Sequence, residues 1–235
     1  LQPLPASQVK AGGLLFDGHT VKTGPASKII LLLSNGTVST IKSDSALNIK
    51  KFTQEKFDPG RKKLSEMKGE PSSSQTVMDL ELGDMVFDVK KLDKRSNFNI
   101  ESPVGTAGIR GTSGQIGVMA NSGGTNLNIN MFKGSVATRL KGSDISTLVR
   151  QGQSFSAGIS AAGIILPPTL GKVPTTMLAA SRAEMTSAGI PPFNFSASCF
   201  FAAMLLLRLS AALIVVVILV FLRFASKTFT LDALR

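Results

Sequence analysis

The chain has no tryptophan or tyrosine, and it has one histidine and one cysteine among 235 residues. With Cys199 alone, no internal disulfide can form, so cysteine says nothing about the redox compartment. Any Ser-His-Asp or Cys-His device would depend on His19, which lies beside Gly18 in an expected turn. Clusters of metal ligands and acidic calcium loops are also missing. We therefore predict no enzyme, no catalytic residue, no metal site and no cofactor.

The excess of positive charge is not arranged as in a nucleic-acid-binding protein. The formal net charge is +11, but only 17% of the residues are charged. The basic clusters at residues 61–63 and 90–95 are diluted by nearby acids, namely Glu66, Glu70, Asp88 and Asp93. A nucleic-acid interface concentrates basic charge on one face, and single-strand binders add aromatic residues for stacking. We expect no nucleic-acid partner; weak attraction to anionic lipid or wall polymer is the alternative.

The hydrophobic pattern predicts short β-strands. The apolar run at 28–33 is followed by Asn35-Gly36 and a second β-branched run at 37–41, which is a strong hairpin signal. Apolar and polar residues alternate in further segments, at 46–50, 85–89, 97–100, 115–119, 127–132, 135–138 and 154–157. We predict a mainly β chain with a single all-β domain of short strands, either a sandwich or a solenoid-like fold.

Composition divides the chain into segments. Residues 1–11 form a leader, 12–158 the β domain, and 159–192 a Pro-rich linker with a marginal helix at 175–188. Inside the domain, residues 53–78 hold many charges, two prolines and a serine run. This pattern predicts an exposed insertion with a short helix near 61–67.

An apolar segment at 199–222 is long enough to cross a bilayer as a helix. Its one charge, Arg208, costs roughly 2.5–3.5 kcal/mol, which the Leu, Ile, Val and Phe residues offset at about 0.3–0.6 kcal/mol each. The basic tail at 223–235 predicts a cytoplasmic C-terminus and a β domain on the other side. A buried helix of a soluble protein and a frame-shifted tail are the alternatives.

Several pieces of the sequence together resemble the FecR domain family. The most specific piece is 98–112, Phe-Asn-Ile-Glu-Ser-Pro-Val-Gly-Thr-Ala-Gly-Ile-Arg-Gly-Thr, which is similar to that family's strand-turn-strand signature. Ser102 stands there for the family's Thr and Gly105 for its Ala. Other similar pieces, in the family's order, are 21–28, 33–38, 47–49, 81–87, 133–136 and 151–155. The resemblance covers roughly residues 12–158.

The resemblance implies an extracytoplasmic sensor or interaction module that takes part in transmembrane signalling and binds a protein partner in the cell envelope. Its ligand is undefined. A structural or adhesin-like surface protein is the alternative. The motif residues that carry the resemblance are Pro103, Gly108, Arg110, Gly111 and Thr112. Among them, Arg110 is the single candidate for ligand binding, since a guanidinium grips a carboxylate or phosphate bidentately. We favour a structural role for it, in which it holds loop carbonyls beside Gly111 and Thr112.

Overall fold

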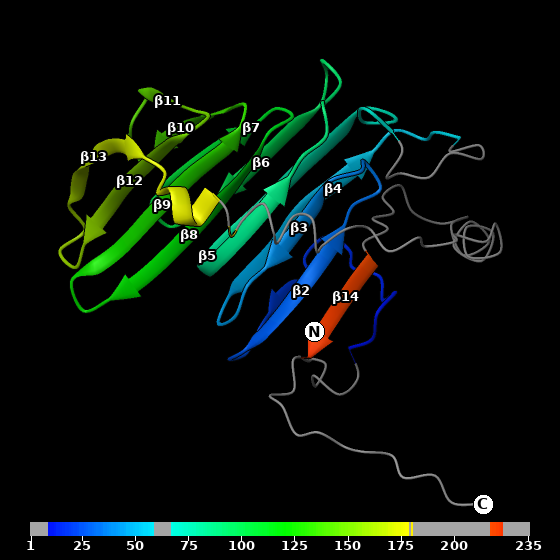
Figure 1. Cartoon of the computed structure of the whole chain (residues 1–235), viewed down its shortest axis with the longest axis horizontal. Helices are drawn as coiled ribbons and strands as arrows, with labels where there is room; N and C mark the ends of the chain where they lie inside the picture. Colours follow the sequence, from blue (N-terminus) through cyan, green and yellow to red (C-terminus); the bar gives the residue numbers. More distant parts are fainter. Residues whose placement is uncertain (1–8, 59–66, 179, 181–216, 223–235) are drawn as a thin grey trace, which may run out of the picture.

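The computed structural model describes residues 9–58, 67–178, 180 and 217–222, and their regular secondary structure is almost entirely β (Figure 1). The only helical residues among them are 175–178 and 180. The described residues form these strands, given in chain order: β1 Thr20–Lys22, β2 Ser27–Leu32, β3 Val38–Ile41, β4 Ala46–Gln54, β5 Ser74–Asp88, β6 Asn97–Glu101, β7 Gly105–Ile109, β8 Ser113–Asn121, β9 Gly124–Lys133, β10 Ser135–Leu140, β11 Ser146–Arg150, β12 Gln153–Ser160, β13 Ile165–Lys172 and β14 Val217–Leu222.

The strands belong to one sheet that β5 divides into two halves. The first half of β5 pairs with β4 and β6, and continues into sheet A, with the order β1-β4-β5-β6-β7-β10-β11. Its second half pairs with β3 and β8, and continues into sheet B, with the order β14-β2-β3-β5-β8-β9-β12-β13. Only β5 and β6 pair in parallel among these named strands. The expected all-β domain is therefore confirmed, but its strands form one continuous sheet around a shared core instead of the expected sandwich of separate sheets or solenoid.

Gly83 marks the point where β5 passes from sheet A to sheet B. Leu82 still pairs with β4, whereas Gly83 pairs with Val118 of β8. The φ angle of Gly83 is +89°, and a Cβ atom built on it would lie 2.1 Å from Ser45 Oγ. A positive φ is unfavourable for residues other than glycine, and Ser45 occupies the space that a side chain would need, so glycine is required where the strand bends.

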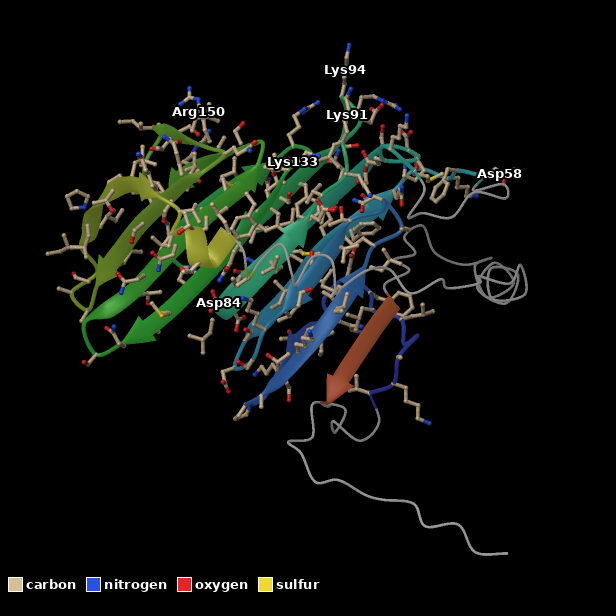
Figure 2. The ribbon with its side chains drawn as sticks, viewed as in Figure 1. Asp58, Asp84, Lys91, Lys94, Lys133 and Arg150 are labelled. Atoms are coloured by element: carbon tan, nitrogen blue, oxygen red, sulfur yellow. The ribbon has the colours of Figure 1, made fainter. Side chains whose placement is uncertain are left out.

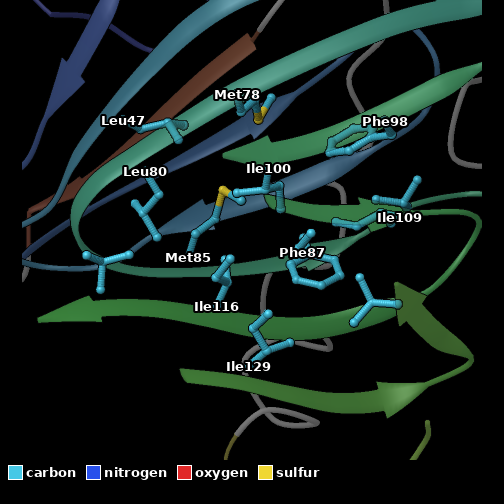
Figure 3. Close-up of a cluster of buried hydrophobic side chains, with 14 of the residues drawn as sticks. Leu47, Met78, Leu80, Met85, Phe87, Phe98, Ile100, Ile109, Ile116 and Ile129 are labelled. Atoms are coloured by element: carbon cyan, nitrogen blue, oxygen red, sulfur yellow. The ribbon is translucent and has the colours of Figure 1, made fainter. Parts of the chain in front are cut away.

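One hydrophobic core lies between the two halves (Figure 3). Alternate residues of each strand point inward, as the period of two requires. Phe52, Phe98 and Ile100 of sheet A belong to the same buried cluster as Phe87 and Ile129 of sheet B. Each of these side chains is at most 1% exposed. The apolar alternation read from the sequence therefore fills a single shared core.

The hairpin predicted at Asn35-Gly36 is confirmed. The β2 and β3 strands pair antiparallel, the amide of Leu33 donates to the Thr37 carbonyl at 2.9 Å, and that of Gly36 donates to the Leu33 carbonyl at 2.9 Å.

The expected exposed insertion at 53–78 needs correction at both ends, because β4 extends to Gln54 and β5 begins at Ser74. Ser74 and Thr76 are buried on the inner side of β5, so polar composition there does not mean exposure. Most of the expected helix at 61–67 lies outside the described residues.

The Pro-rich segment after residue 158 also differs from the expectation of a linker. Residues 165–172 form β13, which pairs with β12 at the end of sheet B. Pro167 and Pro168 fit there because an edge strand tolerates residues that cannot donate to a neighbour, and the register shifts beside them. The expected helix at 175–188 is present at 175–178 and 180, and its remainder lies outside the described residues.

The apolar C-terminal segment is described only at its end. Residues 217–222, expected as part of a spanning helix, form strand β14 against β2. This six-residue end is rich in β-branched and aromatic side chains, which favour extended backbone. Residues 199–216 and the tail at 223–235 lie outside the described residues. Within the described part of the chain, no helix is long and apolar enough to cross a membrane.

Candidate functional site

An open groove of about 770 Å³ lies on the outer side of sheet A. Strands β4, β5, β6, β7 and β10 contribute to it, together with the turn between β10 and β11. It is rich in charges of both signs, with lining residues Lys50, Asp79, Glu81, Glu101, Arg139, Lys141 and Asp144. The remaining lining includes Ser102, Pro103, Gly105 and Thr106, which belong to the FecR-like signature.

Lys50 is held between two carboxylates in the groove. Its Nζ lies 2.7 Å from Asp79 Oδ2 and 2.8 Å from Glu101 Oε2. The geometry follows from the sheet, since Asp79 and Glu101 are directly paired across β5 and β6. A register shift at Lys50 interrupts the pairing of β4 with β5. Hydrogen bonds from the ammonium group to Asp79 and Glu101 raise the pKa of Lys50. Because 44% of this side chain is exposed, the ion pairs position the lysine more than they stabilise the fold.

The opposite wall of the groove carries charges that form no ion pair with other described residues. Arg139 of β10 lies across from Thr106 of β7, and Lys141 follows in the next turn. Among the described residues, neither makes an ion pair, and the same is true of Glu81 and Asp144. The groove thus combines a fixed centre with unpaired charges of both signs. A groove with charges of both signs is better suited to binding a protein surface than to binding a polyanion, which would require basic charge alone.

The signature at 98–112 builds one end of the groove. Ser102 forms the turn between β6 and β7: its Oγ accepts a hydrogen bond from the Gly105 amide at 3.1 Å and donates to the Gly105 carbonyl at 2.8 Å. A Cβ on Gly105 would lie 2.4 Å from the Arg139 carbonyl oxygen, so only glycine lets β10 approach this closely. Of the predicted motif residues, Pro103 lines the groove. Gly108 lies within β7, and Gly111 and Thr112 connect β7 to β8.

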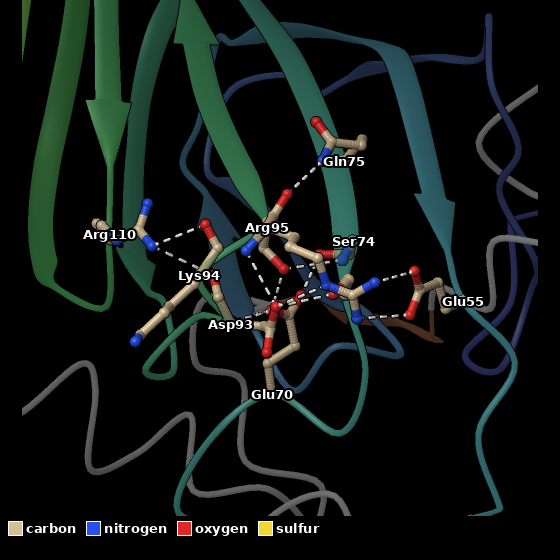
Figure 4. Close-up of polar contacts among 10 residues, drawn as sticks. Glu55, Glu70, Ser74, Gln75, Asp93, Lys94, Arg95 and Arg110 are labelled. Carbon is tan, nitrogen blue, oxygen red and sulfur yellow. Dashed lines mark hydrogen bonds and ion pairs between the residues drawn. The ribbon is translucent and has the colours of Figure 1, made fainter.

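Arg110 lies outside this groove, and its guanidinium contacts the backbone of a loop (Figure 4). Its Nη2 donates to the carbonyl oxygens of Lys94 at 3.1 Å and Asp93 at 3.4 Å. Arg110 therefore contacts loop carbonyls, which is the arrangement that a structural role requires. These carbonyls belong to the loop between β5 and β6, however, and not to the turn beside Gly111 and Thr112. This contact could not be predicted from the sequence, because Arg110 and the loop at Asp93 and Lys94 are brought together only by the pairing of strands in sheet A.

A second polar cluster surrounds Glu70 (Figure 4). The Glu70 carboxylate accepts hydrogen bonds from the hydroxyls of Ser74 and Ser96 and from the amide of Asp93. Arg95 binds Glu55 with both terminal nitrogens, at 3.0 and 3.1 Å. The backbone amide of Arg95 donates to Asp93 and lowers the pKa of that carboxyl. These partners satisfy one another, so the cluster closes the loops and does not offer a binding site. The charged composition of 53–78 gave no signal for it.

Several basic side chains lie along the edge of the molecule that is uppermost in Figure 2, while Asp84 lies near the opposite edge. The labelled ones are Lys91, Lys94, Lys133 and Arg150. Within the described part of the chain, none of these four forms an ion pair.

His19 is a turn residue, as expected. Its Nδ1 accepts a hydrogen bond from the Phe16 amide at 3.1 Å, and its ring meets that of Phe16 edge-on at 5.6 Å. No group of three or more possible metal ligands is found in the described ranges.

Comparison with known proteins gives a family match and a distant structural likeness. The model of the family described as FecR protein matches residues 19–137, just over half of the chain. Two crystal structures of a candidate anti-sigma factor from Parabacteroides distasonis ATCC 8503, at 2.50 and 1.65 Å resolution, each share 12% identity with this chain. The TM-score is 0.47 for each, and the alignment covers 69% of this chain and 63% of theirs. No curated protein matches the sequence.

Proposed function

The chain belongs to the FecR protein family, and on that premise we propose that it is a regulatory, non-enzymatic module that transmits a signal by binding a protein partner in the cell envelope. The family match, which runs from just before β1 into β10, is the observation that carries this proposal. It includes all the FecR-like signature and most of the strands that build the groove on sheet A.

The groove is the proposed docking region for the partner. Lys50 is fixed there by Asp79 and Glu101, so its position is set before a partner arrives. Arg139 and Lys141 stand on the other wall without ion pairs to described residues. A partner with carboxylates facing these two side chains would gain charge-assisted hydrogen bonds that the unbound module lacks.

We further propose that the β domain lies outside the cytoplasm, as the family resemblance implies. The apolar run at 199–222 supports attachment to a membrane, and the basic residues after it support a cytoplasmic C-terminus. Protease added to intact cells tests this arrangement. The full chain should stay with the membrane fraction and lose its β domain to the protease, and a chain ending at Pro192 should leave that fraction. If both chains fractionate alike as soluble protein, the attachment is wrong.

Charge reversal in the groove tests the docking region. Arg139→Glu combined with Lys141→Glu should abolish partner capture by in-cell crosslinking and remove the transcriptional response that depends on the protein. Lys172→Glu is the matched control, since Lys172 is an exposed base at the far end of sheet B. All variants should keep the wild-type far-UV circular dichroism. Retained capture and response in the double variant would contradict docking in the groove.

The transcriptional readout also separates the signalling role from a structural one. Deleting the gene should change transcription if the module signals. A structural or adhesin-like surface protein would instead change attachment or envelope integrity, with transcription unaltered. Only the first result agrees with the proposal.

A further inference from the structure

Strand β2 has the burial of an interior strand. Its residues Ile29, Ile30, Leu31 and Leu32 are each at most 8% exposed, although their side chains alternate between the two faces of the sheet. A continuous apolar run that is buried on both faces is typical of a strand in the interior of a protein, with both of its faces covered. The strand order agrees, because β3 covers one edge of β2 and β14 covers the other.

Backbone groups of successive residues in β2 point alternately toward β3 and away from it, and this alternation identifies the groups on the outer edge of β2. The Leu33 amide donates to the Thr37 carbonyl, so Leu33 is hydrogen-bonded toward β3. In an antiparallel ladder such pairs alternate, so the amides of Ile29 and Leu31 also point to β3. The backbone groups of Lys28, Ile30 and Leu32 therefore point the other way, to β14. Without β14 these groups would form an open edge on an apolar strand, which is a template for further pairing.

Strand β14 meets these groups in continuous register. Val217 lies opposite Leu32, Leu219 opposite Ile30, and Phe221 opposite Lys28. All six residues of β14 are paired, without a register shift. The six residues are also the end of the apolar run at 199–222, the segment that has the length of a membrane span.

We infer that the outer edge of β2 is a strand-binding site for residues 217–222 of this chain, and that docking there and crossing a bilayer are alternative states of the same segment. In a membrane helix, each amide donates to the carbonyl four residues before it, because lipid offers no other partner. The amides of Leu219 and Phe221 cannot make that bond and the bond to β2 together. Membrane insertion therefore uncovers the edge of sheet B, which couples membrane attachment to an exposed strand on the module.

Two proline substitutions in the full chain distinguish a strand from a helix. Leu219→Pro removes an amide that faces β2, whereas Val220→Pro removes one that faces away, where an edge strand tolerates proline. Hydrogen exchange without lipid should show the amides of Lys28, Ile30 and Leu32 about tenfold or more faster in the first variant and near wild type in the second. Protected amides of β8 and β9 will show that each variant is folded. A helix would respond alike to both prolines, and equal exchange in the two variants would overturn the inference.

Disulfide trapping gives a second measurement that does not depend on proline. In a Cys199→Ser background, Lys28→Cys with Phe221→Cys places two thiols in register, and Lys28→Cys with Leu219→Cys is the control, two residues out of register. Directly opposite residues are within the Cα distance of a disulfide, and the offset pair is beyond it. We expect oxidation to crosslink the first pair only. Phosphatidylglycerol vesicles that bind the chain should then lower the yield. Equal yields for both pairs, or an undiminished crosslink on vesicles, would refute the inference.

Discussion

Gly83→Ala tests the bend that joins the two halves of the sheet. An L-residue at a positive φ costs roughly 1–2 kcal/mol. The new methyl group also needs the space of Ser45, whose Oγ lies 2.1 Å from the position that a Cβ atom would take. Moving Ser45 breaks the bond that its Oγ accepts from the Asp84 amide at 3.0 Å and the one that it donates to the Ser43 carbonyl at 3.0 Å. At about 1 kcal/mol per bond, the total loss is roughly 3–4 kcal/mol.

Gly142→Ala is the matched control for the backbone contribution. Gly142 has a φ of +72°, and a Cβ there would meet no heavy atom within 4 Å. This substitution therefore carries the dihedral cost alone, about 1–2 kcal/mol. The difference between the two variants isolates the contact with Ser45, about 2 kcal/mol.

Urea unfolding followed by far-UV circular dichroism is the suitable assay, because the chain has no tryptophan or tyrosine for fluorescence. With a slope of ~2 kcal/mol/M, the midpoint of Gly83→Ala should fall about 1 M below that of Gly142→Ala. Equal midpoints would refute the reasoning, since they would mean that the turn around Ser45 yields without loss and that the bend does not require an empty Cβ position.

Three further predictions concern the core, the signature and pH. Phe98→Ala, at a side chain with no exposed surface, should lower the free energy of unfolding by about 3–5 kcal/mol in the same urea assay; a loss under ~1 kcal/mol would contradict the shared core. Arg110→Ala should lower it by about 1 kcal/mol and leave partner capture unchanged, because its bonds hold the Asp93 and Lys94 carbonyls; lost capture with unchanged stability would instead indicate ligand binding. Because the pKa of Asp93 is lowered in the fold, its contribution is complete well above the ordinary value of 3.8 and is lost as pH falls through the lower folded value. Asp93→Asn should therefore unfold with a weaker dependence on pH in this acid range, and an identical pH profile would contradict that role.

The groove shows how far the sequence alone reaches. The signature predicts a turn between two strands around Glu101 and Ser102, and this turn lies at one end of the groove. Lys50 and Asp79 carried no signal, because a lone charge in an alternating strand is typical of any solvated face. They become a site only when β4, β5 and β6 lie side by side. The same reason explains why Glu70, in a segment predicted to be exposed, was not recognised as the centre of a closed polar cluster.

The sequence by itself determined the β class, the hairpin at Asn35-Gly36 and the family, because alternation, turn chemistry and an ordered set of short motifs are local properties. Tertiary structure decided that β5 belongs to both halves, that Arg110 holds the loop at Asp93, and that residues 217–222 pair with β2. The apolar C-terminal run is long enough for a membrane helix, and it also has the β-branched residues that are typical of a strand, so its sequence is compatible with both. Which one forms depends on whether its backbone finds hydrogen-bond partners within itself or on the edge of another strand, and only the folded sheet supplies that edge.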